Sequence, residues 1–358
     1  MVIVKNIKYT NIPFETKDKD FLRCIEYIKS VDSNYKKYLP KTNKQNLSSE
    51  LTKANSALAN TIRRFLLDEI PVLSMDVSEM NIISDDKFIL TDYLKKNIEM
   101  IPINQDIDKS VKLQLNIENK TDEIISVYAR DIEIYGKNGK KINNETYFTG
   151  TIPIINLRSM CSLKISDIGI VSGLGKHDSG KFILLSNIQY DILDMEPPTT
   201  NKFASQGKSS LVSNPEHFKI SFTTHRNLNI KKIMGICCDT ILSRLNIILK
   251  ELTSLEGNTN VYFSEIITIE TKGNIKLFHF IGEYWTISNL LSRYCYIVYP
   301  DIQFVCSCIV HPSVEESIVK IIHPQSIKIL SDAIKKIISD VNTIKIALKN
   351  DDHSVDVS

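Results

Sequence analysis

Residues 58–71 read Leu-Ala-Asn-Thr-Ile-Arg-Arg-Phe-Leu-Leu-Asp-Glu-Ile-Pro, and this stretch decides the fold. Apolar residues recur through it at helical spacing, which predicts an amphipathic helix within residues 51–70 that Pro71 ends. One face of this helix is expected to be buried. Arg63 and Arg64 then project toward the flanks of the helix, where partners can reach them.

A second stretch repeats the pattern. Residues 287–293 read Ile-Ser-Asn-Leu-Leu-Ser-Arg, so that Asn289 aligns with Asn60 and Arg293 with Arg64. Each stretch is followed by strand-like segments and then by a long helix with an apolar stripe. The chain therefore reads as an internal duplication of one unit.

The composition excludes several classes of protein. Of the 358 residues, 42% are hydrophobic and 24% charged, which is typical of an ordinary globular protein rather than a disordered one. A net charge of +2 gives no global field that would gather nucleic acid or anionic membrane, and no stretch resembles a membrane span. Seven cysteines without regular spacing or a C-x-x-C motif indicate reduced thiols and an intracellular protein.

Turn signals and changes of composition divide the chain into expected parts. The first unit is expected at 1–83 and 211–256, with an extra lysine-rich loop at 18–50, a β-rich domain inserted at 84–210, a second unit at 261–350 and a tail at 351–358.

At these residues the chain resembles the alpha-like subunits of RNA polymerase. These are the bacterial alpha subunit, the archaeal D and L subunits, and the third and eleventh subunits of RNA polymerase II. Residues 58–71 are similar to the first helix of the family, the loop 173–177 follows in the family's order, and residues 283–291 are similar to the L-type signature. The fusion of D-type and L-type halves looks like the arrangement in large cytoplasmic DNA viruses (asfarvirus-like). The cysteine-rich zinc module of many D-type relatives is missing.

The resemblance implies an α+β fold in which two ferredoxin-like alpha-subunit dimerisation units form an intramolecular pseudo-dimer. The linker at 256–260 reaches at most about 18 Å, at about 3.5 Å per residue, so the units must meet nearby. A domain-swapped dimer of chains is the alternative. The expected pseudo-dimer core consists of Leu58, Ile62, Phe65, Leu66, Ile241, Leu245, Ile248, Leu290, Leu291, Ile334, Ile337 and Val341.

The function implied is that of a non-catalytic assembly subunit of a DNA-directed RNA polymerase in viral transcription. Its expected partners are the two largest polymerase subunits and a small zinc-bearing subunit, with DNA contacted only through the complex and no membrane. The cytoplasm of the infected cell and the virion are the expected locations. The expected partner interface is Arg63, Arg64, Arg293, Asn60 and Asn289. No catalytic residue, cofactor or metal ligand is expected.

Two more specific hypotheses, a phosphate-binding site and a metal site, have less support in the sequence. Gly173–Lys176 suggests a phosphate loop, but Ile170 stands where such a loop needs glycine, which favours a glycine turn that contacts a partner. Cys306 and Cys308 share one face of a predicted strand and could bind metal with a nearby histidine, although packed thiols are the commoner outcome.

Two other functions stay open. An independent DNA-binding transcription factor would use Arg63, Arg64 and the lysine-rich residues 36–53 as a basic surface. A stand-alone metal-dependent enzyme ranks third, because no motif places a nucleophile beside a base.

Overall fold

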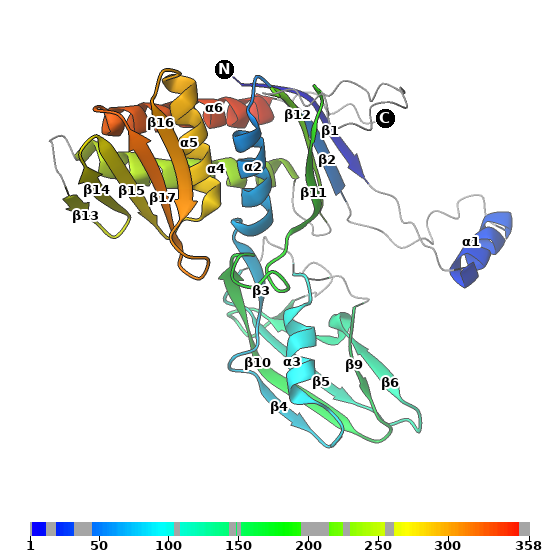
Figure 1. The fold of residues 1–358 in the computed structure, drawn as a ribbon. Helices are drawn as coiled ribbons and strands as arrows, with labels where there is room; N and C mark the ends of the chain where they lie inside the picture. Colours follow the sequence, from blue (N-terminus) through cyan, green and yellow to red (C-terminus); the bar gives the residue numbers. More distant parts are fainter. Residues whose placement is uncertain are drawn as a thin grey trace, which may run out of the picture.

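The structure is a computed structural model that describes residues 2–11, 19–31, 45–103, 108–142, 148, 152–194, 215–224, 230–254 and 261–350. The expected linker at 256–260 and tail at 351–358 lie outside these ranges. Antiparallel sheets and helices make up the described part, so the α+β class is confirmed. Four helices lie between a five-stranded sheet and a four-stranded sheet, with a third, six-stranded sheet below them (Figure 1).

The four-stranded sheet has the order β1-β2-β12-β11, and every pairing in it is antiparallel. Its strands are β1 (Ile3–Asn11), β2 (Gln45–Thr52), β11 (Leu185–Ile192) and β12 (His217–Thr224). Two helices follow strands of this sheet in the chain: α2 (Ser56–Asp68) follows β2, and α4 (Ile230–Ser254) follows β12.

The prediction of an extra loop at 18–50 is wrong at its C-terminal end, because residues 45–50 belong to β2. This strand lies in the middle of the sheet. Leu47, Ser49 and Leu51 are buried, while the residues between them are only partly covered. The alternation of buried and solvent-facing residues in this strand is not visible in its sequence, because a serine occupies one of the buried positions. Helix α1 (Lys19–Val31) precedes it, and residues 32–44 lie outside the described ranges.

The five-stranded sheet has the order β13-β14-β15-β17-β16. Its strands are β13 (Val261–Phe263), β14 (Ile267–Lys272), β15 (Ile275–Ile281), β16 (Phe304–Ile309) and β17 (Glu316–Ile322). Helix α5 (Trp285–Val298) follows β15, and α6 (Ser326–Asn350) follows β17.

The two units share one topology. Three additions are set aside for this comparison: α1 between β1 and β2, the sheet inserted between α2 and β11, and β13. Each unit then runs as two strands, a helix, two strands and a helix, and the sheet order β1-β2-β12-β11 corresponds strand for strand to β14-β15-β17-β16. The chain order is therefore ββαββα in both. A ferredoxin-like unit has the order βαββαβ, so the ferredoxin-like expectation is corrected: one strand stands first instead of last.

The third sheet is inserted between α2 and β11 and has the order β3-β10-β5-β7-β8, with β4 also paired to β10. Its strands are β3 (Val72–Asp76), β4 (Asn81–Ser84), β5 (Lys112–Glu118), β7 (Glu133–Tyr135), β8 (Lys141–Ile142) and β10 (Ser162–Gly173). Beside it lie helix α3 (Thr91–Glu99), the 3-10 turn η2 (Ala129–Asp131) and the pair β6 (Ile125–Tyr128) and β9 (Pro153–Leu157).

Strand pairing moves both expected boundaries of the inserted domain, which were 84 and 210. β3 pairs with β10 and so belongs to the insertion, whereas β11 pairs with β12 and so belongs to the first unit. Separate hydrophobic clusters agree with this division, since Met75 packs in the inserted cluster and Leu185 in the main one. These boundaries depend on which strands pair with each other, and the pairing strands can lie far apart in the sequence. Local composition therefore does not reveal the boundaries.

Helix α2 begins and ends where its sequence provides caps. Asn55 is the N-cap, and its side-chain oxygen accepts a hydrogen bond from the backbone N–H of Leu58 at 2.9 Å. At the other end, the backbone N–H of Glu69 donates to the carbonyl of Phe65 at 3.0 Å, and Pro71 prevents further helix. The helix starts later than the 51–70 pattern suggested, because Leu51 still belongs to β2.

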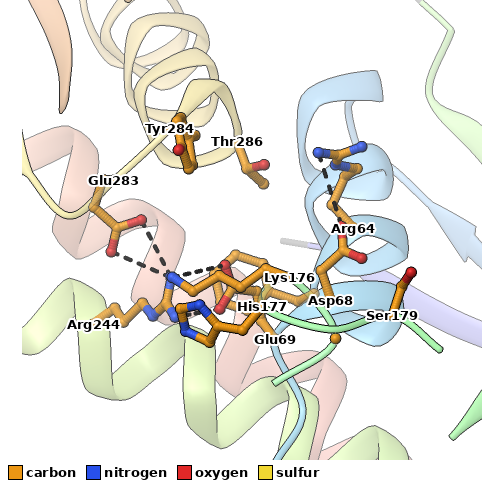
Figure 2. Close-up of a pocket in the computed structure, with 12 residues that line it drawn as sticks. Arg64, Asp68, Glu69, Lys176, His177, Ser179, Arg244, Glu283, Tyr284 and Thr286 are labelled. Atoms are coloured by element: carbon orange, nitrogen blue, oxygen red, sulfur yellow. Dashed lines mark hydrogen bonds and ion pairs between the residues drawn. The ribbon is translucent and has the colours of Figure 1, made fainter. Parts of the chain in front are cut away.

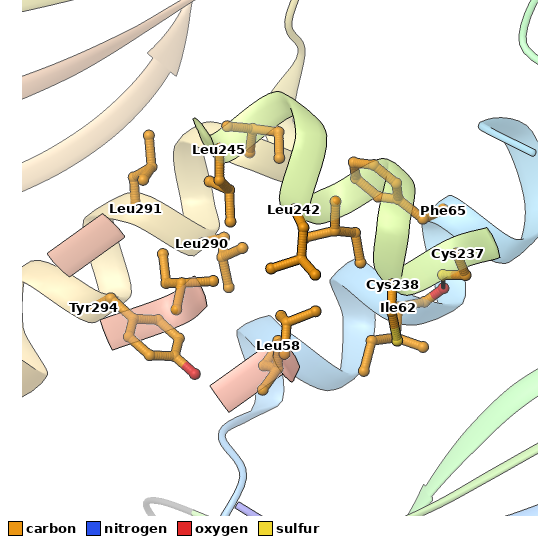
Figure 3. Close-up of a cluster of buried hydrophobic side chains, with 14 of the residues drawn as sticks. Leu58, Ile62, Phe65, Cys237, Cys238, Leu242, Leu245, Leu290, Leu291 and Tyr294 are labelled. Atoms are coloured by element: carbon orange, nitrogen blue, oxygen red, sulfur yellow. Dashed lines mark hydrogen bonds between the residues drawn. The ribbon is translucent and has the colours of Figure 1, made fainter. Parts of the chain in front are cut away.

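The main core is formed where α2, α4, α5 and α6 meet (Figure 3). α2 contacts α4 and α5, and α6 contacts both α4 and α5. All of the residues expected in the pseudo-dimer core are buried in this one cluster: Leu58, Ile62, Phe65, Leu66, Ile241, Leu245, Ile248, Leu290, Leu291, Ile334, Ile337 and Val341. Apolar side chains from both ends of the chain thus share one interior.

Leu290→Ala tests this shared interior. Leu290 is fully buried, so the substitution should lower the free energy of unfolding by about 2–5 kcal/mol through lost burial and a residual cavity. The matched control is Leu90→Ala, whose side chain is 72% exposed and should change stability by less than about 0.5 kcal/mol. Denaturant unfolding of both variants measures the difference, and equal losses would contradict the burial of Leu290.

Candidate functional site

The structure distributes the expected interface residues over two helices. Asn60, Arg63 and Arg64 lie on α2, and Asn289 and Arg293 lie on α5. Arg64, Asn289 and Arg293 are exposed, whereas Asn60 and Arg63 are half-buried.

The two aligned asparagines make different contacts. The side-chain oxygen of Asn60 accepts hydrogen bonds from Nε and Nη2 of Arg63, at 3.1 and 2.9 Å, which fixes that guanidinium against its own helix. Asn289 instead accepts a hydrogen bond from the hydroxyl of Ser307 on β16. The aligned positions are thus equivalent in the helix and different in their partners.

Arg64 leads to a pocket that the sequence did not indicate. The pocket has a volume of about 420 Å³ and lies where the end of α2, the loop after β10, the middle of α4 and the start of α5 come together (Figure 2). Arg293 does not line it. The lining residues are Arg64, Phe65, Asp68, Glu69, Gly175, Lys176, His177, Ser179, Arg244, Glu283, Tyr284 and Thr286.

Arg244 is the central charge of this pocket. Its Nη2 lies 2.5 Å from a carboxylate oxygen of Glu69, and its Nη1 lies 3.3 and 3.4 Å from the two carboxylate oxygens of Glu283. Its guanidinium also lies over the ring of Phe65, 5.2 Å from the ring centre. One arginine of the first unit therefore joins the end of α2 to the residue two positions before α5.

The glycine loop after β10 closes the pocket. The backbone N–H of Lys176 donates to the carbonyl of Asp68 at 3.2 Å, and its ammonium lies 3.8 Å from Glu69 and 4.0 Å from Glu315. Gly175 has to be glycine here, because an added Cβ would lie 2.9 Å from the carbonyl oxygen of Leu67. The loop whose sequence resembles a phosphate loop is thus packed against the C-terminal end of α2.

Burial changes the chemistry of one carboxyl group in the pocket. The pKa of Glu283 is raised to about 7, first by its burial and further by the charge of Glu69, while Arg244 and Lys176 act in the opposite direction. Only 14% of the Glu283 side chain is exposed. The group therefore titrates near neutral pH.

Sequence reasoning missed Glu69, Arg244 and Glu283 as members of a site. Glu69 was quoted within the helix pattern, and Glu283 within the second signature, but nothing in the sequence brings them together. The one available signal was Arg244 itself, a cation beside the apolar stripe of a long helix. A charge at such a position needs a partner, although the sequence does not say which.

The cysteine pair of α4 is packed, whereas Cys308 on β16 is exposed and so is not the packed thiol that the sequence favoured. Among the residues that the structure describes, no three His, Cys, Asp or Glu side chains are placed to hold a metal ion. Cys306 is half-buried and Cys308 exposed on β16. Cys237 and Cys238 are buried in α4, and burial raises the pKa of both thiols.

In the described part of the chain, no helix is both long enough and apolar enough to span a membrane.

Comparison with known proteins identifies relatives over most of the chain, although no protein-family model matches it. A DNA-directed RNA polymerase RPB3-11 homolog from a warthog isolate of African swine fever virus is 28% identical over 319 residues, which is 84% of this chain and 86% of the relative. The RPB3-11 homolog of the Badajoz strain is 27% identical over 317 residues, which is 84% and 85% of the two chains. The asfarvirus-like resemblance read from the sequence is confirmed.

Glu283→Gln should change how stability depends on pH. Since the folded pKa of about 7 lies above the ordinary 4.5, the protonated carboxyl stabilises the fold fully below about pH 4.5, and this contribution is lost as the pH rises through 7. Wild type and variant should therefore unfold alike near pH 4, and wild type should become progressively the less stable between about pH 4.5 and pH 7. Denaturant unfolding across this range measures the difference; wild type gaining stability relative to the variant would contradict the assignment.

Gly175→Ala should loosen the loop from α2. The added methyl group meets backbone atoms that cannot turn away, so we expect a loss of about 1–3 kcal/mol. Gly235→Ala is the matched control, because Gly235 lies inside α4 with no atom near its Cβ position and should gain up to about 1 kcal/mol. Thermal unfolding distinguishes the two signs.

Proposed function

We propose that the chain is a non-catalytic subunit of a multisubunit DNA-directed RNA polymerase, on which the two large catalytic subunits assemble. One observation carries the proposal: the chain holds two copies of a ββαββα unit and is similar, over 84% of its length, to proteins named RPB3-11 homologs. The name of those relatives refers to two polymerase subunits. The two repeated units of this chain are consistent with one unit for each of those subunits.

The two units are proposed to pair within the chain as a pseudo-dimer. The shared hydrophobic cluster supports this, because α2 and α4 from the first unit pack against α5 and α6 from the second. The Glu69–Arg244–Glu283 ion pairs add a polar contact between the same units. Interfaces that are this apolar are typical of permanent association, so neither unit is expected to persist alone.

The outer faces of α2 and α5 are proposed to bind the large subunits. Arg64 and Arg293 are exposed there, and Arg63 is held in position by Asn60. Arginine suits such a surface, since its planar guanidinium can bind a partner carboxylate through two parallel hydrogen bonds. Asn289 lies on the same helix as Arg293 and completes the proposed interface.

The remaining partners follow from the resemblance. We propose a small zinc-bearing polymerase subunit as a further partner, contact with DNA only through the complex, and a cytoplasmic site of viral transcription. The near-neutral charge of the chain supports indirect contact with DNA, because a protein that binds phosphates by itself needs a concentrated basic surface.

The test is co-purification of the tagged full chain with the large polymerase subunits from its native source. Arg63→Ala combined with Arg64→Ala should weaken this association by at least about tenfold, since loss of charged interface contacts costs more than about 1.4 kcal/mol. The matched control removes two exposed lysines of β1, Lys5→Ala with Lys8→Ala, and should leave the association unchanged.

The outcomes separate the candidate functions. A wild-type chain that recovers no large subunit would overturn the proposal. Binding of the isolated chain to DNA, with affinity falling steeply as salt is raised, would support an independent transcription factor instead. Equal losses in both double variants would place the interface elsewhere on the chain.

A further inference from the structure

The last helices of the two units have the same length and the same buried stripe. α4 and α6 both run for 25 residues and can be compared position by position from Ile230 and Ser326 onward. Buried apolar positions of α4 then fall on buried apolar positions of α6: Ile241, Leu245 and Ile248 correspond to Ile337, Val341 and Ile344.

One matched pair of positions in these helices carries opposite charges. Arg244 of α4 and Asp340 of α6 directly precede the corresponding buried residues Leu245 and Val341. The side chain of Arg244 is 21% exposed and that of Asp340 is 6% exposed, so water screens neither charge well. Charges in such places are costly unless each has an opposite partner.

Matched aromatic residues contact these two charges. The alignment of α2 with α5 pairs Phe65 with Tyr294, and both side chains lie in the main core (Figure 3). The guanidinium of Arg244 lies over the ring of Phe65. The hydroxyl of Tyr294 donates a hydrogen bond to Asp340 at 3.1 Å. The two sites are thus equivalent in the duplication, and their charges are opposite.

The two units contribute different residues before their first helices. In the second unit this residue is Glu283, whose carboxylate oxygens lie 3.3 and 3.4 Å from Nη1 of Arg244 (Figure 2). The alignment of α2 with α5 places Ala54 at the corresponding position of the first unit, and Ala54 is buried. The first unit therefore offers no carboxylate there. Asp340 has its own cation in Lys336, at 2.9 Å on the same helix.

These contacts favour the pairing of unlike units. Two second units would bring Glu283 of one chain to Asp340 of the other, so that two carboxylates would meet in a poorly solvated place. Two first units would leave Arg244 without Glu283, with Glu69 of its own unit as a remaining carboxylate. In the observed arrangement both charges have opposite partners.

The apolar stripes of α4 and α6 are too alike to decide which units pair. Apolar packing is not directional, and large aliphatic side chains occupy the matched positions in both helices. Ion pairs that are mostly buried add little net stability, because the loss of water offsets the attraction. They do discriminate between partners, because a wrong partner leaves a charge unpaired or beside a like charge.

We propose that Arg244 and Asp340 determine which units pair, by favouring a first unit against a second unit over two copies of the same unit. The inference rests on the pairing within the chain proposed above. It adds to that pairing the two residues that decide the choice of partner.

A single substitution, Glu283→Arg in the purified full chain, should reverse the choice. Within one chain the new guanidinium would face Arg244, whereas between two chains it would face Asp340 of the other chain. Single chains should therefore associate into dimers through their second units. Light scattering over a range of protein concentrations measures this at pH 8, where Glu283 of the wild type is mostly ionised. The dissociation constant of the dimer should be at least about tenfold lower than for Glu283→Ala.

Three further variants make the result specific. Glu283→Ala removes the carboxylate without adding a cation and should remain a single chain. Glu265→Arg makes the same change of charge at an exposed position and should also remain single. Glu283→Arg combined with Asp340→Asn should dissociate again, because the attraction between the chains is lost. A dimer that persists in this double variant, or a Glu283→Arg chain that stays single, would overturn the inference.

A double-mutant cycle decides the question if Glu283→Arg does not fold. Arg244→Gln, Glu283→Gln and the two together are compared by denaturant unfolding of the full chain at pH 8. The double variant should raise the unfolding equilibrium constant by at least about fivefold less than the product of the two single effects. Independent effects would overturn the inference, because the two units would then not be coupled through this pair.

The outcomes distinguish this inference from the proposals above. A wild-type chain that is itself a dimer would overturn the pairing within the chain, on which the inference rests. A single wild-type chain whose Glu283→Arg variant also stays single would overturn the inference alone. Neither result bears on the polymerase subunit proposal, which co-purification with the large subunits tests.

Discussion

Helix α2 has to bury apolar side chains against several neighbours at once, and the rest of the structure depends on this constraint. Leu58, Ile62 and Phe65 face an interior to which α4, α5 and α6 all contribute. A helix buried this widely has few positions left for polar groups. Its charged residues therefore gather at its exposed flank and at its C-terminal end, and the exposed flank is where we propose that partners bind.

The C-terminal end of α2 shows how packing creates chemistry. Once the apolar face of α2 is docked on α4, Glu69 is brought to Arg244, and the docking of α5 brings Glu283 to the same guanidinium. The loop after β10 then covers the group because Gly175 allows its backbone to approach the helix. The pocket is a consequence of how four separate parts of the chain meet, and the three helices among them are held in place by apolar burial.

The sequence predicted what is local and repeated. The helix within residues 51–70, the duplication and the expected core residues follow from spacing, and each of those core residues is buried. Helix α3 was not predicted. The strand β2 was missed because Ser49 occupies a buried position, and the limits of the insertion were missed because β3 and β11 are assigned by partners far away in sequence. The ion-pair group was missed for the same reason: no residue pattern states that Glu69, Arg244 and Glu283 meet.

The insertion between α2 and β11 also affects how the chain can fold during its synthesis. β2 pairs on one side with β1, but on the other with β12, which is made only after the whole inserted sheet. Until then one edge of β2 stays without a hydrogen-bonded neighbour, and exposed strand edges favour aggregation. The second unit has no such delay, because its strands and helices follow one another without interruption, and short-range contacts form quickly. The part of the chain that leaves the ribosome first is thus the part that must wait longest to be completed.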